Sequence, residues 1–170
     1  MKKQGFTLIE LMVVIVIMGI LAAVAVPKLF GMIAKSKASE VGPAAGTYVK
    51  LQDAYAAERN AAGGWKLIGY TIPASNNFNY AGSIAEGSTV ELASLSNNIG
   101  WQAQNKVALN DCAVNNCFWD IALNNGTAGG QIKYAACLTN NAEPLTANYK
   151  AISTPGESCT VSTSAVSAGQ

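Results

Sequence analysis

Residues 2–10 of the chain are Lys2-Lys3-Gln4-Gly5-Phe6-Thr7-Leu8-Ile9-Glu10, and residues 11–27 continue as LMVVIVIMGILAAVAVP. No ionisable side chain occurs between positions 11 and 27. Because an α-helix rises about 1.5 Å per residue, a helix over residues 6–27 would reach roughly 33 Å, which is about the thickness of a bilayer core. The sequence therefore predicts an N-terminal helix that is able to cross a membrane.

Two ordinary interpretations of this segment are a cleaved secretory signal and a permanent anchor. Lys2 and Lys3 precede the apolar run, and Ala23-Val24-Ala25 has the A-x-A form of a signal-peptidase site. Lys28 follows the run almost as closely, so the lysines do not orient the helix in a membrane. Glu10 fits neither interpretation, because a carboxylate gains nothing from lipid and no Lys or Arg lies one helical turn away.

This N-terminal pattern closely resembles that of type IV pilin precursors, and pseudopilins of type II secretion share it. The resemblance implies that prepilin peptidase removes a leader, residues 1–5, by cutting after Gly5, and then methylates the new amine of Phe6. It implies that Glu10 pairs with the Phe6 amine of a neighbouring subunit, which is the partner that the precursor lacks. Residues 6–27 would form the membrane and filament-core helix, and the segment bounded by Gly19 and Pro27 would melt on assembly.

Residues 28–62 are expected to continue as an amphipathic half of the same long helix. Spacings of three and four place apolar residues on one stripe. The stripe consists of Val41, Ala44, Tyr48, Leu51 and Tyr55. Gly42-Pro43 should bend the helix, and Ala61-Ala62-Gly63-Gly64 should end it. The resemblance implies an α+β fold, in which this half of the helix packs on an antiparallel β-sheet head, residues 63–170.

The head contains all four cysteines of the chain: Cys112, Cys117, Cys137 and Cys159. Their spacing lacks the second close pair of a zinc site, and an even number of cysteines beyond a membrane span suits an oxidising compartment. Three pairings are possible. We favour Cys112–Cys117 with Cys137–Cys159, because these pairs close the smaller loops. A resemblance to major pseudopilins would imply a calcium site, but acidic residues after Asp120 are too sparse for one, so no metal is expected.

The strands of the head are only partly predictable. Residues 117–123 alternate so that Trp119, Ile121 and Leu123 share one face, and residues 131–138 return after a turn to form a hairpin. Residues 149–153 and 159–166 are weaker strand candidates. Residues 60–110 are expected to be rich in loops, with turns at Asn76-Asn77 and Asn97-Asn98. In pilins, segments matching 63–110 and 137–159 form the exposed, variable surface.

Composition excludes several functional classes. The chain has no histidine, so Ser-His-Asp and Cys-His catalysis and imidazole metal sites are ruled out. Charged residues make up 12 % of the chain and the net charge is +1, which provides no basic surface for nucleic acid. We therefore expect no enzymatic activity, no cofactor and no nucleic-acid partner. Aromatic residues of the head could form a sugar-stacking platform, but they are more often core: Trp65, Tyr70, Phe78, Tyr80 and Trp101.

The sequence therefore favours a structural subunit of a type IV pilus. Such a chain would be a single-pass precursor in the inner membrane with its head outside the cytoplasm, and part of a surface filament after assembly. Its partners would be further copies of itself in a helical homopolymer, the cytoplasmic membrane, prepilin peptidase and the pilus assembly machinery. The filament would serve adhesion, motility or uptake. The alternatives are a type II secretion pseudopilin and a minor pilin or adhesin.

Overall fold

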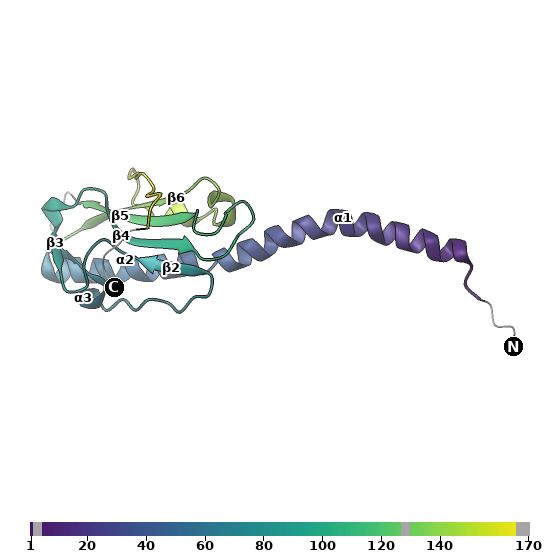
Figure 1. Ribbon diagram of the computed structural model, residues 1–170. Helices are drawn as coiled ribbons and strands as arrows, with labels where there is room; N and C mark the ends of the chain where they lie inside the picture. Colours follow the sequence, from purple (N-terminus) through teal and green to yellow (C-terminus); the bar gives the residue numbers. More distant parts are fainter. Residues whose placement is uncertain (2–4, 127–129, 166–170) are drawn as a thin grey trace.

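The computed structural model describes residues 1, 5–126 and 130–165 as one long helical stalk that ends in a compact head (Figure 1). Helix α1, Leu8–Ala38, projects away from the head, and helix α2, Val41–Arg59, lies along one face of the sheet. The predicted α+β class is confirmed, with the second half of the long helix packed on antiparallel strands.

The two helices meet at a turn over Ser39 and Glu40. We expected the bend at Gly42-Pro43, and the structure places it just before that pair, at Ser39 and Glu40. The reason is that Pro43 has no N–H to donate to the carbonyl of Ser39 four residues before it, so the helical ladder loses a bond there. Glu40 is further held by a hydrogen bond from the Ser75 hydroxyl in the head. In contrast, Pro27 lies inside α1 without ending it.

Helix α2 ends at Arg59, and Asn60 caps it in the left-handed conformation with φ 53°. The prediction of a helix to residue 62, ended by paired glycines, was therefore wrong. Gly63 and Gly64 serve close packing instead. A Cβ on Gly63 would lie 2.8 Å from the Tyr55 ring, and one on Gly64 would overlap the backbone of the loop at Ala85.

The head contains a four-stranded and a two-stranded antiparallel sheet. The larger follows chain order as a meander: β2, Phe78–Ala81; β4, Asn98–Asn105; β5, Phe118–Asn125; β6, Ile132–Leu138. The smaller pairs β1, Ala61–Gly63, with β3, Thr89–Glu91. Four short helical segments complete the described head: α3, Trp65–Ile68; η1, Leu92–Ser94; η2, Glu143–Leu145; η3, Tyr149–Ile152.

The hairpin predicted from the sequence is confirmed as β5 and β6, which pair from Trp119↔Leu138 to Asn125↔Ile132. The predicted inward face of β5 is also confirmed, because Trp119, Ile121 and Leu123 are fully buried in the core. Residues 60–110 contain long loops as expected, with bends at 76–77 and 96–97, but this region also supplies β2 and the inner strand β4.

Two weaker strand predictions also fail. Residues 149–152 form the 3₁₀ helix η3 rather than a strand. Residues 159–165 contain no strand, and Val166 lies outside the described residues. Both segments come after β6 and pack on the sheet through side-chain and disulfide contacts instead of through a strand ladder.

The face of α2 that meets the sheet differs from the predicted stripe in its second half. Val41, Ala44 and Tyr48 are buried as expected. Farther along, Gln52 and Ala56 are buried, whereas the predicted Leu51 and Tyr55 are partly exposed. Gln52 is tolerated there because, with its amide oriented to match, it donates to the Gly63 carbonyl at 3.1 Å and accepts from the Gly63 N–H at 3.0 Å.

Candidate assembly site

The segment before α1 contains the predicted cleavage position in an open environment. Gly5 and Phe6 precede the helix, and Phe6 has an exposed fraction of 87 %. A Cβ placed on Gly5 would meet no atom within 4 Å. Helix α1 begins at Leu8 after Thr7, which has an extended backbone with φ −82° and ψ 150°. The Gly5–Phe6 peptide bond is therefore outside regular structure, between two exposed residues.

Glu10 closes a capping box with Thr7 at the start of α1. The Thr7 N–H donates to Glu10 Oε2 at 2.8 Å, the Thr7 hydroxyl donates to the same oxygen at 2.6 Å, and the Glu10 N–H donates to Thr7 Oγ1 at 3.4 Å. Such boxes satisfy backbone N–H groups that a helix start leaves without partners. Sequence reasoning missed this local role, although the signal Thr7-x-x-Glu10 is present in the chain.

The rest of α1 presents apolar side chains outward. Large apolar side chains are exposed around the whole helix, from Leu8 to Ile33. Within the described residues, α1 is buried against the head near its end, at Ala34 and Ala38. By length and composition, this helix is able to cross a membrane. A helix that is apolar all round requires either lipid or other helices around it.

Gly19 and Pro27, the predicted limits of the melting segment, both lie within helical structure in this single chain. A Cβ placed on Gly19 would meet no atom within 4 Å, so this glycine is under no packing constraint here. Pro27 leaves the Ala23 carbonyl without its usual donor. The single chain therefore shows a weak point in the helix and no melting.

The aromatic residues considered for a sugar platform are buried in the head. Trp65, Tyr70, Phe78, Tyr80 and Trp101 have exposed fractions of 7 % or less. Trp101 Nε1 donates to the Tyr70 hydroxyl at 2.8 Å, and Trp65 Nε1 donates to the Gly100 carbonyl at 2.9 Å. Burial raises the pKa of Tyr70 to about 12. These rings form the core between α2 and the sheet and cannot stack on a ligand.

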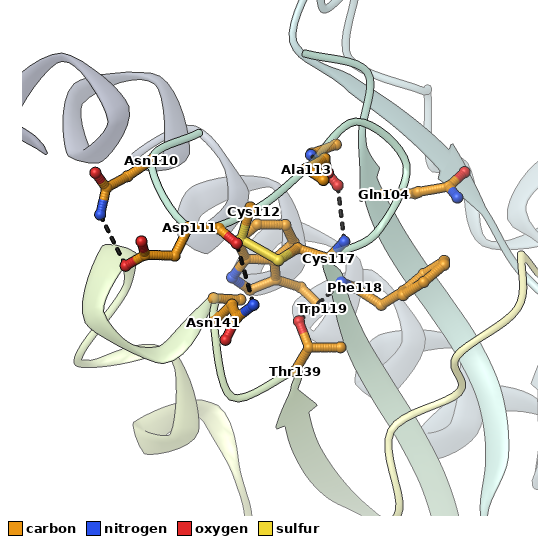
Figure 2. Close-up of a disulfide and its surroundings, with 12 residues drawn as sticks. Gln104, Asn110, Asp111, Cys112, Ala113, Cys117, Phe118, Trp119, Thr139 and Asn141 are labelled. Carbon is orange, nitrogen blue, oxygen red and sulfur yellow. Dashed lines mark hydrogen bonds between the residues drawn. A yellow bond between two sulfur atoms is a disulfide. The ribbon is translucent and has the colours of Figure 1, made fainter. Parts of the chain in front are cut away.

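The four cysteines form two disulfides, Cys112–Cys117 and Cys137–Cys159, which is the pairing that we favoured from the sequence. Figure 2 shows the first of them with the loop that it closes before β5. The Asn141 amide donates to the Asp111 carbonyl at 3.0 Å, and Phe118 N–H donates to the Thr139 hydroxyl at 3.3 Å (Figure 2). These bonds join the loop to the segment after β6.

A side chain that the sequence did not single out organises the same loop. Asn105, at the end of β4, is fully buried. Its amide donates to the carbonyls of Val107 and Ala113 at 2.9 and 2.7 Å, and its Oδ1 accepts from the Cys117 N–H at 2.8 Å. Within the described residues, no group of three His, Cys, Asp or Glu could hold a metal ion.

Comparison with known proteins supports the resemblance noted in the sequence. Residues 1–26 match the family model of the prokaryotic N-terminal methylation motif. The chain is 33 % identical over 160 residues to a type IV major fimbrial protein FimA of Dichelobacter nodosus, covering 94 % of this chain and 89 % of that protein. It is 36 % identical over 87 residues to the type IV major pilin protein PilA of Myxococcus xanthus, covering 51 % of this chain.

Several other matches cover a smaller share of the chain. The fimbrial protein EcpC of Eikenella corrodens is 54 % identical over 44 residues, or 26 % of this chain. The match to PilA spans 40 % of that protein, and the match to one of the other FimA proteins spans 25 %. No solved structure matches the chain significantly. Because the FimA match extends through the helix and the head alike, the chain belongs to the type IV pilin family.

Proposed function

We propose that this chain is the structural subunit of a type IV pilus and has no catalytic role. The observation that carries this proposal is the FimA relative, a major fimbrial protein that aligns with 94 % of the chain. The fold supports it, because a stalk that is apolar on all sides, attached to a disulfide-linked head, suits packing of many stalks into a bundle with the heads outside. Neither the secretion pseudopilin nor the minor adhesin is favoured by a specific feature of the described structure.

Processing would occur at the open segment before α1. We propose that prepilin peptidase removes residues 1–5 after Gly5 and that the Phe6 amine is then methylated. The exposure of Phe6 and the lack of contacts at Gly5 support access by an enzyme. The precursor would lie in the inner membrane through residues 6–27, with its head outside the cytoplasm, where both disulfides can form.

The capping box supports a specific geometry for assembly. Both Thr7 donors bind the same oxygen of Glu10, Oε2. The carboxylate thus retains an acceptor, Oε1, for a cation from a neighbouring chain. We propose that this cation is the Phe6 amine of the next subunit, created by cleavage. Cutting after Gly5 leaves the Phe6–Thr7 peptide intact, so the capping box persists in the processed chain and holds the carboxylate in place. The segment between Gly19 and Pro27 would extend as the filament forms.

Deletion of the gene, followed by electron microscopy of the cell surface and an assay of secreted enzymes, tests the function. The proposal predicts loss of surface fibres with normal release of exoproteins, and restoration of the fibres by the wild-type gene in trans. Fibres that persist while exoprotein release is lost would contradict it and would identify a secretion pseudopilin instead.

A further inference from the structure

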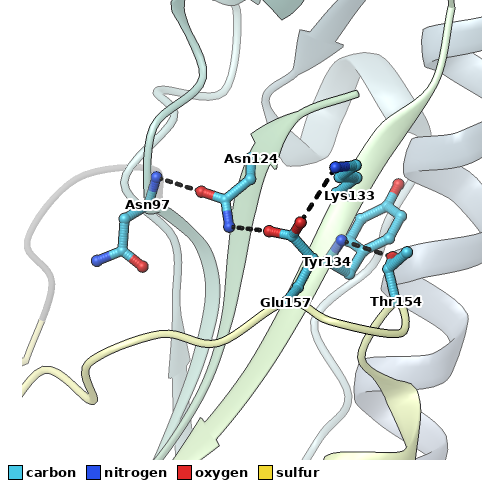
Figure 3. Close-up of polar contacts among 6 residues, drawn as sticks. All are labelled: Asn97, Asn124, Lys133, Tyr134, Thr154 and Glu157. Carbon is cyan, nitrogen blue, oxygen red and sulfur yellow. Dashed lines mark hydrogen bonds and ion pairs between the residues drawn. The ribbon is translucent and has the colours of Figure 1, made fainter. Parts of the chain in front are cut away.

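The chain after η3 crosses the outer face of the larger sheet, opposite α2, and we name residues 154–164 the strap. At the edge strand β6, Thr154 N–H donates to the Tyr134 carbonyl at 2.8 Å, and Tyr134 N–H donates to the Thr154 hydroxyl at 3.0 Å. Farther along, Glu157 accepts from the Asn124 amide at 2.9 Å and lies 3.3 Å from Lys133 Nζ (Figure 3). Disulfide Cys137–Cys159 then joins the strap to β6.

Beyond Cys159, two hydrogen bonds join the described part of the strap to the sheet. Ser162 N–H donates to Asp120 Oδ2 of β5 at 2.6 Å, and the Gln102 amide of β4 donates to the Ser164 carbonyl at 3.3 Å. Side chains of residues 160–164 are exposed or only partly buried, so they add little apolar burial. The part after the disulfide can therefore open locally while the covalent link keeps the rest of the strap in place.

Asp120 is a fully buried carboxyl beneath this part of the strap. Its neighbours on the sheet, Gln102 of β4 and Cys137 of β6, are uncharged, and Oδ1 has no hydrogen bond within the described residues. A buried carboxylate without a cation is costly, and opening of the strap would return it to water. We propose that residues 160–164 form a pH-sensitive latch, closed on Asp120 in mildly acidic surroundings and open more often at neutral pH.

The direction of the pH effect follows from the two states of Asp120. Burial raises the pKa of Asp120 to about 6 in the closed state, although the Ser162 N–H and Gln102 lower it in part. The ordinary value is 3.8. Because the closed state binds the proton more tightly, closure is strongest below pH 3.8 and weakens as the pH rises through about 6. Between pH 4 and pH 7, the opening equilibrium constant should rise roughly 50-fold.

Other titratable groups on this face do not reverse the effect. Tyr149 of η3 interacts with the charge of Asp120. Burial is the main cause, and the Asp120 charge a second one, that holds the pKa of Tyr149 well above its ordinary value. The Tyr149 hydroxyl therefore stays protonated throughout this pH range. Glu157 and Lys133 are paired with each other near Asn124, four residues along β5 from Asp120, which is about 13 Å. No charged side chain contributes to the pKa shift of Asp120 among the described residues.

Hydrogen exchange of the Ser162 amide tests this proposal directly in the full chain in detergent micelles, by NMR at pH 4 and pH 7 with correction for intrinsic exchange rates. We expect protection of the Ser162 amide to fall roughly 50-fold at pH 7. Asp120→Asn should abolish the pH dependence, while Asp111→Asn, which removes an exposed carboxylate, should preserve it. Equal protection at both pH values, or a drop that persists in Asp120→Asn, would overturn the latch.

A measurement on the unmodified chain removes dependence on how the variant folds. The carbon chemical shift of the Asp120 carboxyl should titrate near pH 6 in the wild type. A midpoint at or below 3.8 would overturn the proposal even if Asp120→Asn failed to fold.

Discussion

The hydroxyl of Tyr48, on α2, occupies the space that a side chain on Gly100 of β4 would need. A Cβ placed on Gly100 would overlap Tyr48 Oη and lie 2.8 Å from Leu123 Cδ1. Gly100 also falls where the pairing register between β4 and β5 shifts, between Ile99 and Trp101. The contact between the helix and the sheet thus depends on one missing side chain at a bulge.

Gly100→Ala should destabilise the head by about 1–3 kcal/mol, because overpacking at this point forces α2 and β4 apart. Tyr48 Oη is buried without a hydrogen bond among the described residues, so Tyr48→Phe alone should change the free energy of unfolding little. In the double variant, Tyr48→Phe should restore part of the stability that Gly100→Ala removes. Denaturation of the full chain in detergent, followed by near-UV circular dichroism, measures all three. Strict additivity of the two substitutions would show that the residues do not share this space.

A second helix–sheet contact is a hydrogen bond from the Tyr134 hydroxyl on β6 to Asp53 Oδ1 on α2, at 2.7 Å. Tyr134→Phe should lower the free energy of unfolding by about 1–2 kcal/mol, because the substitution removes a donor from a carboxylate. Tyr149→Phe is the matched control, since the Tyr149 hydroxyl is buried without a partner within the described part of the chain. The same denaturation assay compares them. If Tyr149→Phe lowered the free energy of unfolding as much as Tyr134→Phe, the bond between Tyr134 and Asp53 would not explain the effect.

The two disulfides should differ in their resistance to reduction. Cys112 and Cys117 have exposed fractions of 0 and 1 %, whereas Cys159 is partly exposed on the strap. A mild reductant under native conditions should therefore open Cys137–Cys159 first, because the attacking thiolate must reach a sulfur atom. Alkylation of the released thiols and mass mapping at successive times gives the order. Earlier labelling of Cys112 would be inconsistent with the burial of the first disulfide.

Glu10→Ala should leave membrane insertion intact, since it removes a charge from an apolar helix, but should prevent efficient polymerisation. The measurement compares the amount of the variant chain in the membrane fraction with its amount in sheared filaments. Glu58→Ala, an exposed acid on α2 that pairs only with the adjacent Arg59 among the described residues, is the control and should assemble normally. A normal filament yield from Glu10→Ala would exclude a role for its carboxylate in setting subunit order.

The parts of this molecule with strong local patterns were predictable from the sequence. The apolar stalk follows from seventeen residues without a charge, and the β5–β6 hairpin follows from alternation around Trp119 and Ile121. The cysteine pairing follows from the smaller loops that it closes. The predicted position of the helix bend was nearly right. The bend lies slightly before Pro43 because Pro43 leaves the carbonyl four residues earlier without a donor.

The remaining parts depend on contacts that local patterns do not encode. Strand β4 contains Gln102 and Asn105, which are polar yet buried, because Asn105 satisfies the backbone of a loop and Gln102 binds the strap. Gln52 on α2 is buried for the same kind of reason, through the Gly63 backbone. These partners lie outside the strand or helix that carries each polar residue, so the alternation and helical periodicity that would reveal a strand or a stripe were absent. The local capping box at Glu10, in contrast, was recognisable and was overlooked.

The intact mass of this protein in appendages sheared from cells, taken without reduction, tests the central claim most directly. We predict a chain that begins at Phe6, carries one additional methyl group and lacks the four hydrogens that two disulfides remove. That single mass would establish cleavage after Gly5, methylation, assembly and both disulfides together. A chain that begins at Val26, after the Ala23-Val24-Ala25 sequence, would contradict the claim and identify a secreted protein, and absence from the sheared fraction would contradict assembly into a pilus.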